Sequence, residues 1–279
     1  MKAASFDYQR PATLKDALRA LADGGGAAKV MGGGQSLGPM LNLRLTRPKQ
    51  VVDVSALAEL RQVAAEGDQL RIGAAVTHAE IEDGVHPLLR DGLLQSVAGG
   101  IAYRAIRNRG TLGGSLAHAD PAADWVLTMA ALGAQIEIAS ATGMRRVPME
   151  RFMQGAYTTD LADGELLAAV LVPRLGPAAR WGYFKFCRKT GEFAEASCAA
   201  VFDPSRKLAR IVLGALDGAP QALPALAAQV ARDAAMPSRD TLRSAVAAAL
   251  PAKDAVDRKL MVAAVERCLH QIFVPELST

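Results

Sequence analysis

The sequence is poor in cysteine and contains no long uninterrupted apolar run. Its cysteines, Cys187, Cys198 and Cys268, form no Cys-x-x-Cys pair, which predicts reduced, buried thiols and not a disulfide framework. Three scattered thiols cannot supply the four ligands of an ordinary iron–sulfur cluster. No apolar stretch approaches the roughly 20 residues of a membrane-spanning helix, and the amino terminus lacks the apolar core of a secretory signal. We therefore expect a cytoplasmic protein without a membrane span.

The sequence also has no strong excess of either charge. Lysine and arginine number 32 against 28 acidic residues, a formal net charge of +4, and no basic run is longer than a pair. Nucleic acid is therefore not expected as a partner. The four histidines, His78, His86, His118 and His270, are isolated and lack the spacing of metal ligands. We expect structural or loop roles for them, with no metal site and no catalytic side chain.

Hydrophobic residues make up 51% of the chain, enough for the core of one large domain or two modest ones. Their periodicity, with turn residues between the periodic segments, predicts a mixture of helices and strands. In the first part of the chain we expect strands at Phe6–Tyr8, Lys29–Met31, Val51–Val54, Gln62–Ala65, Gln69–Gly73, Ala134–Ala139 and Leu166–Val172. We expect helices at Leu14–Leu21, with Thr13 as the cap, and at Leu37–Leu43, His78–Asp83, Leu88–Val97 and Pro121–Leu132.

A break containing proline and glycine at Pro173–Pro177 predicts a domain boundary near residue 176. We therefore expect one domain over residues 1–176 and a second over residues 177–279. The second domain begins with a predicted three-stranded antiparallel meander, formed by Gly182–Arg188, Ser197–Phe202 and Leu208–Leu216. Two or three alanine-rich helices follow, the last at Val256–Ile272.

Two segments, Gly32–Ser36 and Arg107–Ser115, hold more glycine than packing alone usually requires. Glycine lets a ligand approach the main chain, and consecutive N–H groups with nearby hydroxyls form a concavity that binds anions. A lone Gly-Gly pair is usually a turn, but two such loops together favour a site that grips the pyrophosphate of one dinucleotide from both sides. Neither loop is a fingerprint of another class, since Pro39-Met40 stand where a P-loop requires Lys and Ser/Thr, and no G-x-G-x-x-G follows a strand.

Three strings of residues carry a resemblance to a known family: Met31–Leu37 (MGGGQSL), Ala105–Leu116 (AIRNRGTLGGSL) and Ala117–Asp124 (AHADPAAD). They resemble the FAD-binding medium subunit of the xanthine dehydrogenase family, which includes aerobic carbon monoxide dehydrogenase and related molybdenum hydroxylases. The resemblance covers essentially the whole chain. It implies an α+β fold of the vanillyl-alcohol-oxidase (PCMH) type, with non-covalent FAD stretched between two α+β lobes, and a carboxy-terminal domain with a three-stranded antiparallel sheet and helices.

The resemblance also implies which residues bind FAD. The first loop would hold the pyrophosphate, the second further phosphate and ribityl contacts, and Asp124 the ribityl chain or nearby polar groups. Ala102, Lys185 and Phe193 would lie close to the isoalloxazine ring, with Phe193 covering one face. The implied set is Met31, Gly32, Gly33, Gly34, Gln35, Ser36, Leu37, Ala102, Arg109, Thr111, Gly113, Gly114, Ser115, Asp124, Leu161, Lys185 and Phe193.

The chain departs from the family pattern at several of these positions. Met31-Gly32 stand where Ala-Gly-Gly is more usual, Tyr103 where a histidine is frequent, and Phe193 where a tyrosine is commoner. A phenyl ring can stack on the flavin but cannot donate a hydrogen bond. The departures therefore bear on the tuning of the flavin potential.

Several polar residues near the second loop have two interpretations. Arg107 and Arg109 flank Asn108, and one of them could offset the pyrophosphate charge, while such arginines equally often tie a loop to nearby carbonyls. Asp120, before Pro121, predicts a helix start, which would place Asp124 one turn later on the same face. There Asp124 would be a solvated helix acid or, as the resemblance implies, a ligand of the ribityl chain.

The resemblance predicts an electron-transfer role. The chain would accept electrons from the 2Fe-2S clusters of a small subunit, while a large subunit holds the molybdopterin, in a heterotrimer or its dimer. It would pass the electrons to an acceptor such as NAD⁺, a quinone or oxygen. Two alternatives remain: a stand-alone FAD-dependent oxidase or dehydrogenase acting directly on a small molecule, and a nucleotide-binding assembly protein. The stand-alone enzyme is less favoured, because Gln35 and its neighbours offer no His or Cys for covalent flavin attachment.

Overall fold

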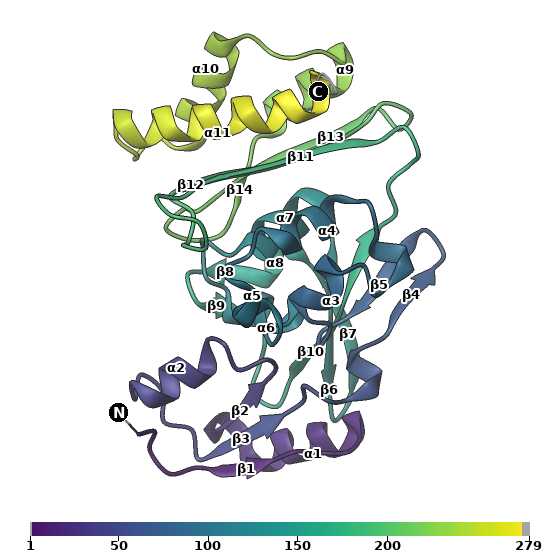
Figure 1. Ribbon diagram of the computed structural model, residues 1–279, viewed down its shortest axis with the longest axis vertical. Coiled ribbons are helices and arrows are strands. Elements are labelled where there is room, and N and C mark those ends of the chain that lie inside the picture. The colour runs from purple at the N-terminus through teal and green to yellow at the C-terminus, as the bar shows by residue number, and fades with distance from the viewer. Residues whose placement is uncertain (1, 275–279) are drawn as a thin grey trace.

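The computed structural model describes residues 2–274, which form three larger sheets and one short hairpin (Figure 1). The amino-terminal sheet has three parallel strands in the order β1 (Asp7–Gln9), β3 (Gln50–Asp53) and β2 (Ala28–Met31). Helix α1 (Leu14–Gly24) packs on it, and the Thr13 hydroxyl accepts a hydrogen bond from the Asp16 N–H at 3.1 Å, which confirms the predicted cap. The first glycine loop follows β2 directly and leads into α2 (Leu37–Asn42).

The central sheet has five antiparallel strands, in the order β4 (Val63–Glu66), β5 (Gln69–Gly73), β10 (Leu166–Pro173), β6 (Gln135–Ser140) and β7 (Gly143–Pro148). The predicted β4–β5 hairpin is confirmed, with Gly67 in the left-handed region at its turn. Strand β7 was not predicted, because it is an exposed edge strand without a regular apolar alternation.

Short helices cover the central sheet and carry the second glycine loop. They are α3 (His78–Glu82), α4 (Leu93–Gly99), α5 (Arg104–Arg107), α6 (Leu112–His118), α7 (Asp124–Leu132) and α8 (Met149–Phe152), the last followed by the hairpin of β8 (Met153–Gly155) and β9 (Thr158–Thr159). Trp125 on α7 and Phe152 on α8 are fully buried in the core that these helices share with the sheet.

Two helices in this region differ from their predicted bounds. The helix expected over residues 88–97 is a 3₁₀ turn followed by α4, because Asp91 takes a left-handed backbone before Gly92. The helix expected from Pro121 begins at Asp124. Asp120 instead closes a turn, in which its carboxylate accepts from the Ala122 N–H and its carbonyl from the Ala123 N–H.

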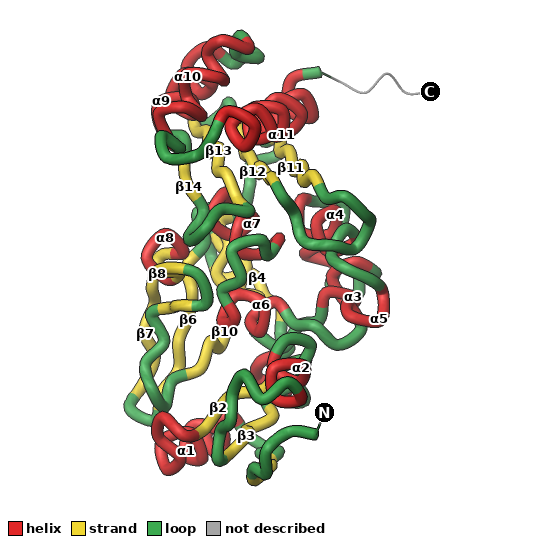
Figure 2. The backbone as a smooth tube through the Cα atoms, turned by 90° about the vertical axis from the view of Figure 1, so that its left-hand side faces the viewer, coloured by secondary structure: helices red, strands yellow, loops and turns green. Residues whose placement is uncertain are grey.

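The carboxy-terminal sheet is antiparallel, in the order β11 (Arg180–Phe186), β12 (Ala196–Asp203), β13 (Leu208–Gly214) and β14 (Gln221–Ala222). It therefore has four strands where three were predicted, because two residues are too few to leave a sequence pattern. Helices α9 (Pro224–Asp233), α10 (Arg239–Ala249) and α11 (Ala255–Phe273) lie on one side of this sheet, and α7 lies on the other (Figure 2). Strand β12 is buried along its whole length as a result.

Of the three cysteines, Cys198 and Cys268 are buried and Cys187 is half-buried, and all three are free thiols, as the sequence predicted. The pKa of Cys268 is raised well above its usual value, because burial disfavours the thiolate.

Candidate functional site

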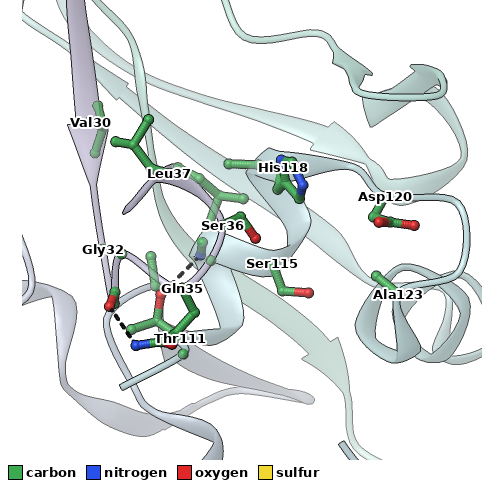
Figure 3. Close-up of a pocket in the computed structure, with 18 of the residues that line it drawn as sticks. Val30, Gly32, Gln35, Ser36, Leu37, Thr111, Ser115, His118, Asp120 and Ala123 are labelled. Carbon is green, nitrogen blue, oxygen red and sulfur yellow. Dashed lines mark hydrogen bonds between the residues drawn. The ribbon is translucent and has the colours of Figure 1, made fainter. Parts of the chain in front are cut away.

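A cleft of about 590 Å³ lies where the two glycine loops meet, within the range of roughly 300–1,000 Å³ that small-molecule sites occupy. Both loops line it, together with segments near Ile101, Tyr157 and Phe193. Figure 3 shows Gly32, Gln35, Ser36 and Leu37 of the first loop beside Thr111 and Ser115 of the second. Gly33 and Gly113, 80 residues apart in the chain, therefore face one shared cavity.

Close backbone contacts explain the glycines at two of these positions. A Cβ atom on Gly33 would lie 1.7 Å from the Arg109 carbonyl oxygen, so the two loops approach main chain to main chain. A Cβ atom on Gly113 would lie 2.4 Å from the Cβ of Ala74, where the second loop rests on the residues after β5. Glycine is needed for the loops to pack against each other and against the sheet.

Hydroxyl and backbone groups dominate the polar lining at the end of the cleft where the two glycine loops meet. The Thr111 hydroxyl accepts a hydrogen bond from the Gly114 N–H at 3.1 Å and so caps α6. Ser36 and Ser115 also line the cavity, and Gln35 donates from its amide to the Gly33 carbonyl at 3.4 Å. Among the described residues, Lys29 is the one lysine or arginine of the lining. An anion held here would therefore depend mainly on neutral donors.

The other end of the cleft is lined by Ile101, Ala102 and the loop between β11 and β12. Ala102 has a φ of 43°, an unusual left-handed conformation for a residue with a Cβ. Phe193 is 65% exposed, and its side chain is free to contact a ligand. Gly191 packs against the ring of Tyr103, where an added Cβ would lie 2.6 Å from the ring carbon that carries the hydroxyl. This end therefore offers apolar and aromatic surface to a ligand.

Asp124 also lines the cleft and accepts two short hydrogen bonds from the carboxy-terminal sheet. The Tyr183 hydroxyl and the Lys185 ammonium both donate to its Oδ1 at 2.6 Å. Lys185 also donates to the Gly100 carbonyl at 2.8 Å. Burial and the adjacent Asp124 carboxylate raise the pKa of Tyr183 well above its usual value. The cluster joins β11 to the start of α7 and to the segment before Ala102.

His78 also lines the cleft and was not among the predicted site residues. It is only 4% exposed, and its Nδ1 accepts a hydrogen bond from the indole N–H of the buried Trp125 at 2.9 Å. Burial, with a smaller contribution from Arg107, lowers the pKa of His78 to about 4, so the ring is neutral at pH 7. A histidine 47 residues from its partner leaves no pattern that sequence reasoning could have used.

All but three of the predicted site residues line this cleft. Met31 and Arg109 are outside its lining, although the Arg109 carbonyl touches Gly33. Lys185 is also outside it and reaches the site through Asp124 and Gly100. Of the two interpretations of the arginines, Arg107 ties the loop, since it donates to the carbonyls of residues 101 and 102.

Three side chains that line the cleft, Tyr157, Asp120 and His118, form a cluster that was not among the predicted site residues. The Tyr157 hydroxyl donates to Asp120 at 3.3 Å, and its ring lies 5.2 Å from that of His118. The Asp120 carboxylate raises the pKa of Tyr157. The A-H-A-D string holds two members of this cluster, but Tyr157 comes from the separate β8–β9 hairpin.

Within residues 2–274, no group of three or more His, Cys, Asp or Glu side chains could hold a metal ion. No helix in that same part of the chain combines the length and apolar character needed to cross a bilayer.

The protein has a mixed helix-and-sheet fold, with a cleft that joins a glycine-rich end to an apolar and aromatic end. Residues 4–175 match the family model described as the FAD binding domain in molybdopterin dehydrogenase. The chain is 35% identical to the 6-hydroxypseudooxynicotine dehydrogenase complex subunit alpha of Paenarthrobacter nicotinovorans, over 89% of this chain and 85% of that one. It is 34% identical to the carbon monoxide dehydrogenase medium chain of Hydrogenophaga pseudoflava, over 78% of this chain and 76% of that one.

A solved structure gives the same result in three dimensions. The carbon monoxide dehydrogenase of Hydrogenophaga pseudoflava that lacks the Mo-pyranopterin moiety of its molybdenum cofactor superposes with a TM-score of 0.86 and 30% identity. The match covers 97% of this chain and 98% of that one. The chain therefore belongs to the family of FAD-binding subunits of molybdopterin dehydrogenases, as the sequence motifs predicted.

Proposed function

We propose that this chain is the FAD-carrying electron-transfer subunit of a molybdenum hydroxylase complex. It accepts electrons from the iron–sulfur clusters of a partner subunit and passes them to an external acceptor. The observation that carries the proposal is the single cleft shared by two remote glycine loops, in a chain whose family binds FAD. The relatives are parts of dehydrogenase complexes, which favours this role over a stand-alone oxidase or a non-catalytic nucleotide-binding protein.

The cleft fits FAD in its shape and its donors. The backbone contact at Gly33 leaves no room for a side chain between the loops, and Ser36, Thr111 and Ser115 add hydroxyls beside them. These groups suit the pyrophosphate, as the amide-rich concavity of a glycine loop does elsewhere. The apolar end near Ala102 and Phe193 suits the isoalloxazine ring.

The residues that we assign to FAD differ in how they act. The lining residues bind directly: Gly32, Gly33, Gly34, Gln35, Ser36, Leu37, Ala102, Thr111, Gly113, Gly114, Ser115, Asp124, Leu161 and Phe193. Met31, Arg109 and Lys185 support them from behind, through the strand, the loop contact and the Asp124 hydrogen bond. The cofactor is non-covalent, because the first loop contains neither His nor Cys.

Within the complex, this chain would bind FAD, and the partner subunits would hold the other cofactors. FAD, when bound, supplies the redox chemistry, since a flavin can exchange electrons singly or in pairs. The chain's own residues bind the dinucleotide and orient its ring, and His78, buried beside Gly110 of the second glycine loop, is neutral at pH 7. Molybdopterin and 2Fe-2S clusters belong to a large and a small partner subunit, in a heterotrimer or its dimer.

We further propose that residues 1–176 form a FAD domain of the PCMH type, whose two lobes are the β1–β3 sheet and the central sheet with their helices. Residues 177–279 form the second domain, and the complex resides in the cytoplasm. The distinct hydrophobic cluster under α9–α11 supports the division of the chain.

The experiment uses the purified full-length chain loaded with FAD. Addition of a dithionite-reduced 2Fe-2S small subunit, freed of excess dithionite, is expected to bleach the visible flavin absorption. In a second reaction, aldehydes, alcohols and N-heterocycles are added without NADH and without the partner subunits. These compounds are expected to leave the flavin oxidised. Rapid bleaching by one of these compounds alone would identify a stand-alone dehydrogenase, and failure to bind FAD at all would refute the proposal.

A further inference from the structure

We propose that Arg107, held in place by Glu82, is a positioning residue for the flavin ring. Its guanidinium fixes the Ile101–Ala102 segment of the cleft in the conformation that the ring requires. This inference rests on the proposed function, because it needs a flavin at that end of the cleft.

The hydrogen bonds of Arg107 run in two directions. Its Nη1 donates to the Ile101 carbonyl at 2.9 Å and to the Ala102 carbonyl at 3.2 Å. Its Nε and Nη2 donate to the two carboxylate oxygens of Glu82 at 2.7 and 2.9 Å. The Arg107 side chain is 12% exposed. A planar guanidinium held by a bidentate carboxylate has one orientation, and through Nη1 it imposes that orientation on the two carbonyls.

The segment that Arg107 holds is strained and faces the cleft. Ile101 and Ala102 both line the cavity, and Ala102 has a φ of 43°. A left-handed backbone is unfavourable for a residue with a Cβ atom, so the surroundings of Ala102 must hold it in this conformation. Among residues 2–274, no backbone carbonyl accepts a hydrogen bond from the Ala102 N–H.

A second cation restrains the same segment. Lys185 donates to the carbonyl of Gly100, so three successive carbonyls are held by charged donors. Lys185 comes from the carboxy-terminal sheet, whereas Arg107 comes from α5. Because both cations are paired with carboxylates, their effect on the cleft is one of geometry more than of net charge.

Arg104 provides a matched control on the same short helix. It also donates to Glu82, at 2.8 Å, and to both oxygens of Asp83 at 2.6 Å. It is 48% exposed and makes no hydrogen bond to the cleft segment. Loss of Arg104 removes ion pairs from α5 and leaves the hydrogen bonds to the Ile101–Ala102 segment in place. Loss of Arg107 removes both an ion pair and those hydrogen bonds.

The test compares Arg107→Gln with Arg104→Gln in the full-length chain, by FAD titration, visible flavin spectrum and reduction potential of the bound flavin. Because two hydrogen bonds from a charged donor are lost, we expect Arg107→Gln to raise the FAD dissociation constant roughly tenfold or more and to shift both the spectrum and the potential. Arg104→Gln is expected to change the constant by less than about twofold, as exposed ion pairs do. Arg107→Lys is expected to fall between wild type and Arg107→Gln, because an ammonium does not reproduce the guanidinium fork.

Equal effects of Arg107→Gln and Arg104→Gln on affinity, spectrum and potential would overturn the inference. If Arg107→Gln does not fold, Arg107→Lys and Arg104→Lys are compared in the same way, and indistinguishable flavin spectra and potentials overturn it. A wild-type chain that binds no FAD contradicts the proposed function itself, whereas normal wild-type binding with a silent Arg107 contradicts only this inference.

Discussion

Replacing Gly33 by alanine tests whether the main-chain contact between the two loops is required for the cleft to hold a dinucleotide. The added Cβ would lie 1.7 Å from the Arg109 carbonyl oxygen and 2.9 Å from the Gly110 Cα. It falls roughly 1.7 Å short of the 3.4 Å at which ordinary van der Waals contact begins, and the obstructing atoms are backbone that cannot rotate away. The loops must therefore separate, and the donors on either side of the pyrophosphate move apart.

Overpacking of this kind costs about 1–3 kcal/mol, so binding of FAD should weaken by about 5- to 150-fold if the strain is relieved in the unbound state. The assay is titration of the apoprotein with FAD, followed by quenching of flavin fluorescence, with the free energy of unfolding measured in urea. Gly38→Ala is the control, because its Cβ meets nothing within 4 Å and it lies in α2 directly after the same loop. If Gly33→Ala binds FAD as tightly as Gly38→Ala, the contact between the two glycine loops is not required for FAD binding.

Three further predictions follow from the rest of the site. The pKa of His78 is about 4, below its ordinary value of 6.5, so the unfolded chain takes up the proton first as the pH falls. The free energy of unfolding should thus drop by up to about 3 kcal/mol between pH 6.5 and 4. In urea titrations, His78→Gln should show a shallower fall with pH, because its amide oxygen can still accept from the indole but does not titrate. Parallel curves for the wild type and the variant would contradict this. Phe193→Ala should weaken FAD binding about fivefold and alter the visible flavin spectrum, because stacking of an aromatic side chain contributes roughly 1 kcal/mol. Phe193→Tyr should keep the affinity, since its ring can still stack. Unchanged spectra in both variants would show that Phe193 does not contact the isoalloxazine ring. Lys185→Met should lower the free energy of unfolding by about 3 kcal/mol, because it leaves the Asp124 carboxylate short of a partner. The double variant with Asp124→Asn should recover part of that loss in urea unfolding, and strict additivity would show that the pair is not coupled.

Local chemistry was sufficient to predict most of the secondary structure. The Thr13 cap, the hairpin turn at Gly67 and the three long strands of the carboxy-terminal sheet depend on residues close together in the chain. The helix predicted over Pro121–Leu132 begins only at Asp124, because the carboxylate and carbonyl of Asp120 accept from the N–H groups of Ala122 and Ala123 and form a turn there.

The glycine loops and the strings around them were enough to identify the family, and with the family the cofactor. The contact of Gly33 with the second loop, the pairing of His78 with Trp125 and the hydrogen bonds of Arg107 to the segment at Ala102 became visible only in the folded chain. The two groups of features differ in the range of the interactions that produce them. Capping, turns and glycine conformations act over a few residues and leave a pattern in the chain. The contacts that shape the cleft join segments far apart, and they exist only once the sheets and helices have packed.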